Sequence, residues 1–146
     1  MTSAPHPGAQ NERLVVKSSF SELERVVDAA YTFFSAITDN MELVHKVMLL
    51  TSEAVSNGMK HGNKLAADKT VTIDFRYHTQ YFEVWVEDEG EGYVREEIPD
   101  PLSAEHLMDE GGRGVFLIEK MADEVRYEFG GRRVGMIFRK ESEESG

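Results

Sequence analysis

Apolar and polar residues alternate along two neighbouring segments in the middle of the chain, 71–77 and 82–86. The apolar positions are Val71, Ile73, Phe75 and Tyr77 in the first segment and Phe82, Val84 and Val86 in the second. A period of two is typical of β-strands that bury one face. The segments on either side of Gly130-Gly131 repeat the pattern, which predicts a hairpin with a glycine turn. We therefore expect a sheet that is buried on one side only.

Helical signals separate these strands. Ser21 and Glu24 form a capping-box pattern, which opens a helix that ends near residue 37. Asn40 is placed to cap a second helix over about 41–61, and a third helix covers about 113–121. The core stripe of the second helix is Val44, Val47, Met48, Thr51 and Val55. With a first strand at 13–18, the order β-α-α-β-β-loop-α-β-β predicts an α+β fold, with helices on one face of a mostly antiparallel sheet.

Composition limits the class of protein. The chain has 146 residues, of which 40% are hydrophobic, so we expect one folded domain over 12–140 with polar tails at 1–11 and 141–146. Without a long apolar run or a signal peptide, we expect a cytoplasmic protein that does not enter membranes. The net charge of -11 opposes direct contact with nucleic acid and favours protein partners. The absence of cysteine excludes disulfides and thiolate chemistry.

Three polar residues share one row of the second helix. Glu53, Asn57 and His61 lie four residues apart, and Leu49 and Leu50 precede them on the same side, which favours a partly covered cleft over an ordinary solvated face. An amide oxygen such as that of Asn57 suits Mg²⁺, while a glutamate one turn away can act as a base. His61 either assists the site or caps the helix end, and we favour the cap.

A carboxylate follows the strand at 82–86. Asp88 continues the apolar face of that strand, where an unpaired charge would be costly, so a ligand amino group is expected to satisfy it. Gly90 and Gly92 in the pattern Asp88-x-Gly90-x-Gly92 allow a ring to approach the backbone, and the adenine amine is the donor we expect. The same pattern is also a common turn.

Glycines also precede the third helix. Gly111-Gly112-Arg113-Gly114 places free N–H groups at a helix start, which predicts an anion site that differs from a P-loop because no Lys-Ser/Thr pair follows. The irregular segment 96–110 is long for a connection and suits a lid.

Together these residues resemble the N, G1 and G2 boxes of the GHKL ATPase superfamily. The boxes correspond to 53–61, Asp88 to Gly92 and Gly112 to Gly114, and the resemblance covers about 20–140. The stretches 52–58 and 114–125 are most similar to bacterial anti-sigma factor serine/threonine kinases. The resemblance implies a Bergerat-type two-layer sandwich on a mostly antiparallel, mixed sheet, and a homodimer. It also implies Mg-ATP binding, phosphorylation of a STAS-domain anti-anti-sigma protein, sequestration of a sigma factor and thus regulation of transcription.

By the same resemblance Glu53 is the catalytic base, Asn57 the Mg²⁺ ligand, Asp88 the adenine anchor, and Gly112 and Gly114 the phosphate loop. Two departures concern the phosphate contacts. Asp109 and Glu110 stand where some members have a basic residue, so Arg113 would have to substitute, and Met136 follows Gly135 where many relatives have threonine.

Two other functions fit less of the chain. A histidine-kinase catalytic domain would need a phosphoacceptor histidine on a dimerisation helix, and His45 lacks that context; an ATP-binding module without kinase activity is the other alternative. Tyr81 and Trp85 lie on the polar side of the strand, so we expect an exposed aromatic patch that serves a symmetric dimer or a protein partner.

Overall fold

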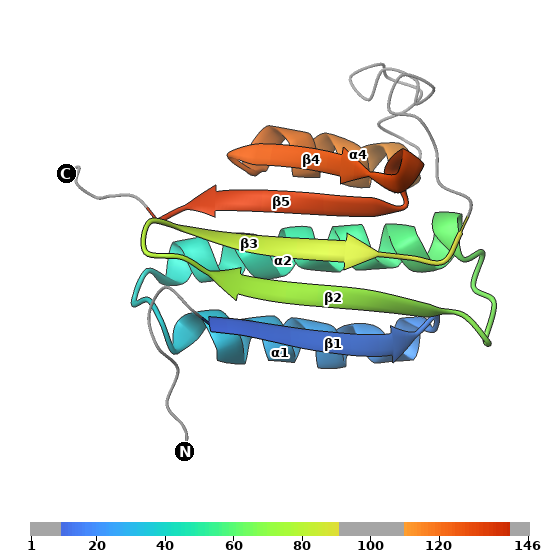
Figure 1. The fold of residues 1–146 in the computed structure, drawn as a ribbon, viewed down its shortest axis with the longest axis horizontal. Coiled ribbons are helices and arrows are strands. Elements are labelled where there is room, and N and C mark those ends of the chain that lie inside the picture. The colour runs from blue at the N-terminus through green and yellow to red at the C-terminus, as the bar shows by residue number, and fades with distance from the viewer. Residues whose placement is uncertain (1–9, 91–109, 141–146) are drawn as a thin grey trace.

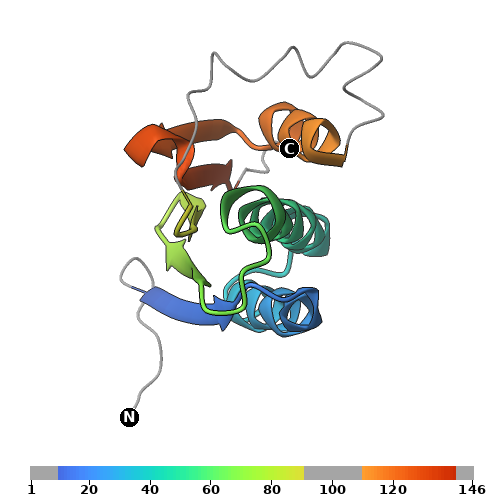
Figure 2. The ribbon, with the colours of Figure 1, turned by 90° about the vertical axis from the view of Figure 1, so that its right-hand side faces the viewer.

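A five-stranded sheet carries the α-helices on one of its faces, as Figures 1 and 2 show from two directions. The structure is a computed structural model that describes residues 10–90 and 110–140. Its strands are β1 Gln10–Lys17, β2 Thr70–Tyr77, β3 Tyr81–Glu87, β4 Glu124–Glu128 and β5 Arg133–Arg139, and its α-helices are α1 Leu23–Ser35, α2 Met41–Asn57 and α4 Glu110–Met121. Short helices η1 Phe20–Glu22, η2 Gly58–Gly62 and η4 Phe129–Gly131 complete the order. The predicted two-layer α+β sandwich is confirmed.

The strand order in the sheet is β1-β2-β3-β5-β4. Each neighbouring pair is antiparallel, so the sheet formed by residues 10–90 and 110–140 contains no parallel pair that would make it mixed. β5 lies between β3 and β4, which places α4 beside α2 in the helical layer (Figure 1). This arrangement brings together the two helices that carry the predicted site residues.

The helix-facing side of the sheet forms the core. The predicted apolar positions of β2 and β3 are buried, and Phe34 from α1 packs against Phe75 and Phe82 with ring centroids 5.6 and 4.6 Å apart. Leu50 is fully buried in this core, whereas Leu49 is 41% exposed. A helix turns 100° per residue, and the apolar arc of α2 is wide enough to include Leu50.

The opposite face of the sheet is also partly buried, which corrects the expected aromatic patch. Trp85 is only 5% exposed, because the guanidinium groups of Arg133 and Arg76 lie 4.3 and 5.7 Å from the centre of its ring. Its ring lies against Gly135, its register partner on β5, where a Cβ would come within 2.5 Å. Tyr81 is half-buried and stacks on a histidine ring. The tryptophan is therefore covered within the chain, and it supports no dimer interface.

An ion pair between a buried aspartate and an exposed arginine lies next to this tryptophan. Asp74, 8% exposed, faces Trp85 across the β2–β3 pair and accepts two hydrogen bonds from Arg13 of β1, at 2.7 and 3.1 Å. This pair raises the pKa of Arg13 above its usual value, chiefly through the hydrogen bond. Arginines from three strands thus cover a face that the alternation pattern predicted to be open to water.

The helix starts partly follow the predicted signals. The Oδ1 of Asn40 accepts a hydrogen bond from the N–H of Leu43 at 3.1 Å, which confirms the predicted cap of α2. The capping box at Ser21 is wrong: the extended Ser19 caps a short 3-10 turn through the N–H of Ser21, and α1 begins at Leu23. Among residues 10–90 and 110–140, no helix is long and apolar enough to cross a bilayer.

Candidate nucleotide site

The carboxyl end of α2 changes its winding within the predicted row. The α-helix ends at Asn57, and η2 continues it as a π-helix in which the N–H of Asn63 bonds to the carbonyl of Gly58 at 2.8 Å. Glu53 and Asn57 remain one turn apart and are half-buried, whereas His61 is exposed. The expected regular helix over 41–61 is therefore wrong beyond Asn57, and wide turns of this kind occur often at functional sites.

α4 packs directly on Glu53 and Asn57. A Cβ added to Gly114 would lie 2.8 Å from Asn57 Nδ2 and 3.0 Å from Glu53 Oε1, so a side chain at this position would displace the ends of these two side chains. Gly114 comes from a segment more than fifty residues later in the chain, yet it covers the row that the sequence assigned to a cleft. The row is therefore not an ordinary solvated helix face.

The G2 glycines begin α4. The helix starts at Glu110, about three residues earlier than expected, so Gly112 belongs to its first turn instead of a preceding loop. The first four N–H groups of a helix have no intrahelical acceptor, and they can bind an anion such as phosphate. Gly92 and most of the segment predicted as a lid, 96–110, lie outside the described residues.

Asp88 follows β3 and faces η2. The Asp88 carboxylate lies so close to Gly62 that a Cβ added to Gly62 would overlap it. A Cβ added to Gly58 would lie 3.4 Å from the Cβ of Asp88. Gly90 in turn lies on the backbone of Gly62, where a Cβ would overlap the carbonyl oxygen. The glycine at position 90 is thus required by close backbone packing. One continuous segment, α2 with η2, touches both Gly114 and Asp88.

The Asp88 carboxyl is poised to accept a further hydrogen bond. Burial raises its pKa above the usual value, and the hydrogen bond from the N–H of Gly90 (2.7 Å) and the charge of Arg132 oppose this only in part. A carboxylate has about four acceptor positions, and the one hydrogen-bond donor to it among the described residues leaves capacity for a ligand amino group. The geometry fits the predicted adenine anchor.

Asn63 connects the Asp88 loop to the rest of the domain, and the sequence analysis missed it. It is 1% exposed, and its Nδ2 donates to Ser18 Oγ at 2.6 Å and to the Thr70 carbonyl at 2.9 Å. Its Oδ1 accepts from the N–H of Glu89 at 2.7 Å. Thr70 also donates to the Glu89 carboxylate, which lowers the pKa of Glu89. The only local signal was Gly62-Asn63, which reads as a helix stop.

The residues present fit a magnesium nucleotide. No group of three or more histidine, aspartate or glutamate side chains forms a metal site among the described residues. Mg²⁺ commonly takes one or two protein ligands and completes its octahedron with water and phosphate oxygens. An amide oxygen from Asn57 beside a glycine-rich helix start provides such a partial set.

Comparison with known proteins agrees with this geometry. The family described as "Histidine kinase-like ATPase domain" matches residues 17–138. The chain is similar to "Serine-protein kinase RsbW" of Bacillus licheniformis, with 34% identity over 91 residues, and to proteins of the same name from Bacillus subtilis, 32% over 89 residues, and Listeria innocua, 30% over 91 residues. Each match covers 57–58% of this chain and 56–58% of the relative.

Proposed function

This chain belongs to the histidine kinase-like ATPase family, and on that premise we propose that it is a Mg-ATP-dependent protein serine kinase. The resemblance to GHKL ATPases supports nucleotide binding, and relatives named serine-protein kinases support the phosphotransferase class. The chain spans only a little over half the length of those relatives, so its activity and partners are part of the proposal.

The observation that carries the proposal is the contact of three boxes around one helix end. Gly114 lies on Glu53 and Asn57, and Asp88 lies on Gly58 and Gly62 within the next five residues. A nucleotide bound there would extend from Asp88, which accepts the adenine amine, to the first turn of α4, whose N–H groups hold phosphate. Mg²⁺, held by Asn57, would neutralise charge on the phosphates.

Glu53 acts as the base in this proposal. It takes the proton of the attacking serine hydroxyl while the serine oxygen bonds to the γ-phosphorus and ADP leaves with the electrons of the broken bond. Gly112 and Arg113, at the start of α4, contact the phosphates. Arg113 supplies the positive charge that some relatives place at the position of Asp109 or Glu110. His61 is exposed and has no role in this step.

The partners follow from the family resemblance alone. We propose a STAS-domain anti-anti-sigma protein as the substrate, a sigma factor as the sequestered partner, a cytoplasmic location and a homodimer that does not use Trp85. Phosphorylation of the STAS protein would leave the sigma factor bound to this chain, and the genes that the sigma factor transcribes would stay silent.

The proposal is tested by transfer of the γ-phosphate of labelled ATP to a STAS-domain protein encoded nearby. Glu53→Ala should lower transfer by about 10²–10⁴ while nucleotide affinity stays within a few-fold, since a general base contributes about that much. Asn57→Ala should weaken both, and Glu24→Ala on the exposed face of α1 is the matched control. Nucleotide binding without transfer in the wild type would instead identify an ATP-binding module that is not a kinase.

A further inference from the structure

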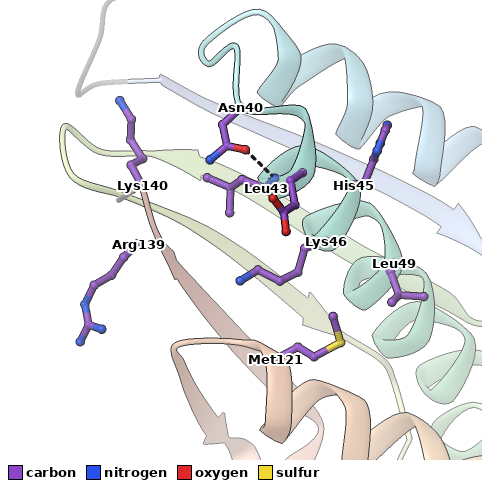
Figure 3. A pocket seen from close by; sticks show the side chains of 9 residues that line it. Asn40, Leu43, His45, Lys46, Leu49, Met121, Arg139 and Lys140 are labelled. Carbon is purple, nitrogen blue, oxygen red and sulfur yellow. Dashed lines mark hydrogen bonds between the residues drawn. The ribbon is translucent and has the colours of Figure 1, made fainter. Parts of the chain in front are cut away.

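A cavity of 410 Å³ opens at the other end of α2, away from the nucleotide site. Its lining includes Leu43, Lys46, Leu49, Met121, Arg139 and Lys140, from the start of α2, the end of α4 and the end of β5 (Figure 3). Lys46 and Asn57 are eleven residues apart on one helix, which corresponds to about 16 Å at 1.5 Å per residue. The two sites therefore lie toward opposite ends of α2, and Leu49, one turn before Glu53, is the lining residue of α2 nearest the nucleotide site.

The base of the cavity is apolar. Leu43 is 6% exposed and contributes to the core, Met121 is half-buried, and Leu49 is 41% exposed, one of the most exposed large apolar side chains in the described part of the chain. Covering a water-exposed leucine with another apolar side chain is favourable because it removes apolar surface from water. This base favours a ligand with an apolar group.

The rim of the cavity is cationic in a protein of net charge -11. Figure 3 shows Lys46 extending from α2 toward the end of β5, where Arg139 and Lys140 lie, while His45 points away from them. Within residues 10–90 and 110–140, Lys46 has no ion pair, and the ammonium of Lys140 lies 3.3 Å from the hydroxyl and 4.8 Å from the ring centre of Tyr77. Arg139 is 3.8 Å from Asp123, and Glu42 is the acidic lining residue. Three cations and one acidic residue thus lie among the side chains that line the cavity.

We propose that this cavity docks an acidic segment of a protein partner, one that inserts a leucine-like side chain over Leu49 and Met121 and places carboxylates beside Lys46 and Lys140. Charge complementarity favours an acidic occupant, and the apolar base requires an apolar anchor next to the carboxylates. Residues 141–146 of this chain have three glutamates but no apolar side chain, so they do not satisfy the base. The docking does not depend on nucleotide binding or phosphotransfer.

The test titrates the full chain, labelled with ¹⁵N, with the acetylated peptide Glu-Leu-Glu-Glu-Leu-Glu, observed by amide chemical shifts. We expect the shifts to concentrate at Leu43, Lys46, Leu49 and Met121. Two control peptides, one with each glutamate replaced by lysine and one with each leucine replaced by serine, should cause no shifts. Lys46→Glu should weaken binding at least tenfold, whereas Lys17→Glu, the same charge change on an exposed residue of β1, should leave it within about twofold.

Several outcomes would overturn the docking proposal. Equal loss for the two lysine variants would mean that only the overall charge matters, and displacement of the peptide by Mg-ATP would place it in the phosphate site. If the peptide bound only after removal of 141–146, the tail would be the occupant. If the same amides shifted with protein concentration alone, a second copy of the chain would fill the cavity.

Discussion

Asn63→Ala tests whether the buried amide holds the Asp88 loop in place. The side chain makes three hydrogen bonds, to Ser18, Thr70 and Glu89, and each contributes about 0.5–1.5 kcal/mol net. Their loss should lower the free energy of unfolding by about 3 kcal/mol, a large part of the roughly 5–15 kcal/mol that stabilises a domain. For a chain of this length that corresponds to a fall in melting temperature of about 10 °C.

The assay is urea unfolding and thermal melting, with and without Mg-ATP. Ser18→Ala removes a single bond and should cost about 1 kcal/mol, and Asn11→Ala, at an exposed position of β1, should change stability by less than about 0.5 kcal/mol. Because Asn63 binds the N–H next to Asp88, Asn63→Ala should also weaken Mg-ATP binding. A melting temperature within about 2 °C of the wild type would refute the argument that this amide organises the site.

Three further predictions concern the packing around the site and the sheet. Gly114→Ala should weaken Mg-ATP binding because its Cβ would displace the side-chain ends of Asn57 and Glu53, even though a glycine-to-alanine change inside a helix normally stabilises by about 1 kcal/mol. Unchanged Mg-ATP affinity in calorimetric titration would contradict that contact. Burial raises the pKa of Asp88 above the ordinary carboxyl pKa, so the free energy of unfolding of the wild type should fall as the pH rises from the ordinary pKa to the raised one. In urea unfolding, Asp88→Asn should be as stable as the wild type below this pH range and more stable above it. Trp85 is the single tryptophan and is buried, so the fluorescence emission of the protein should shift to longer wavelength on unfolding. Trp85→Ala should lower the free energy of unfolding by about 3–5 kcal/mol. Emission typical of exposed tryptophan in the native protein would refute the burial.

Local pattern was sufficient to predict most of the fold. The period-two faces of β2 and β3 and the Asn40 cap depend on neighbours within a few residues, and the structure agrees with them. Trp85 was misplaced because its cover is not local: Arg133 lies on β5, 48 positions along the chain, and reaches it only through the β3–β5 pairing. Alternation along one strand carries no information about such cross-strand arginines.

The candidate site shows the same limit. The sequence could identify Glu53, Asn57 and Asp88 as residue types in motifs, but it could not show that Gly114 lies on the first two or that Gly62 lies on the third. The π-turn of η2 has no clear local signal either. Asn63 has a long-range partner 45 positions away in Ser18, and no periodicity detects it.

Calorimetric titration of ATP into the wild type and Asp88→Asn, with and without Mg²⁺, tests the nucleotide site most directly. The site predicts Mg²⁺-dependent binding by the wild type and no measurable binding by a variant that remains folded, because the adenine amine would lose its charged acceptor. Equal binding by the two proteins, or no binding by the wild type, would contradict the assignment of Asp88 and the nucleotide site built on it.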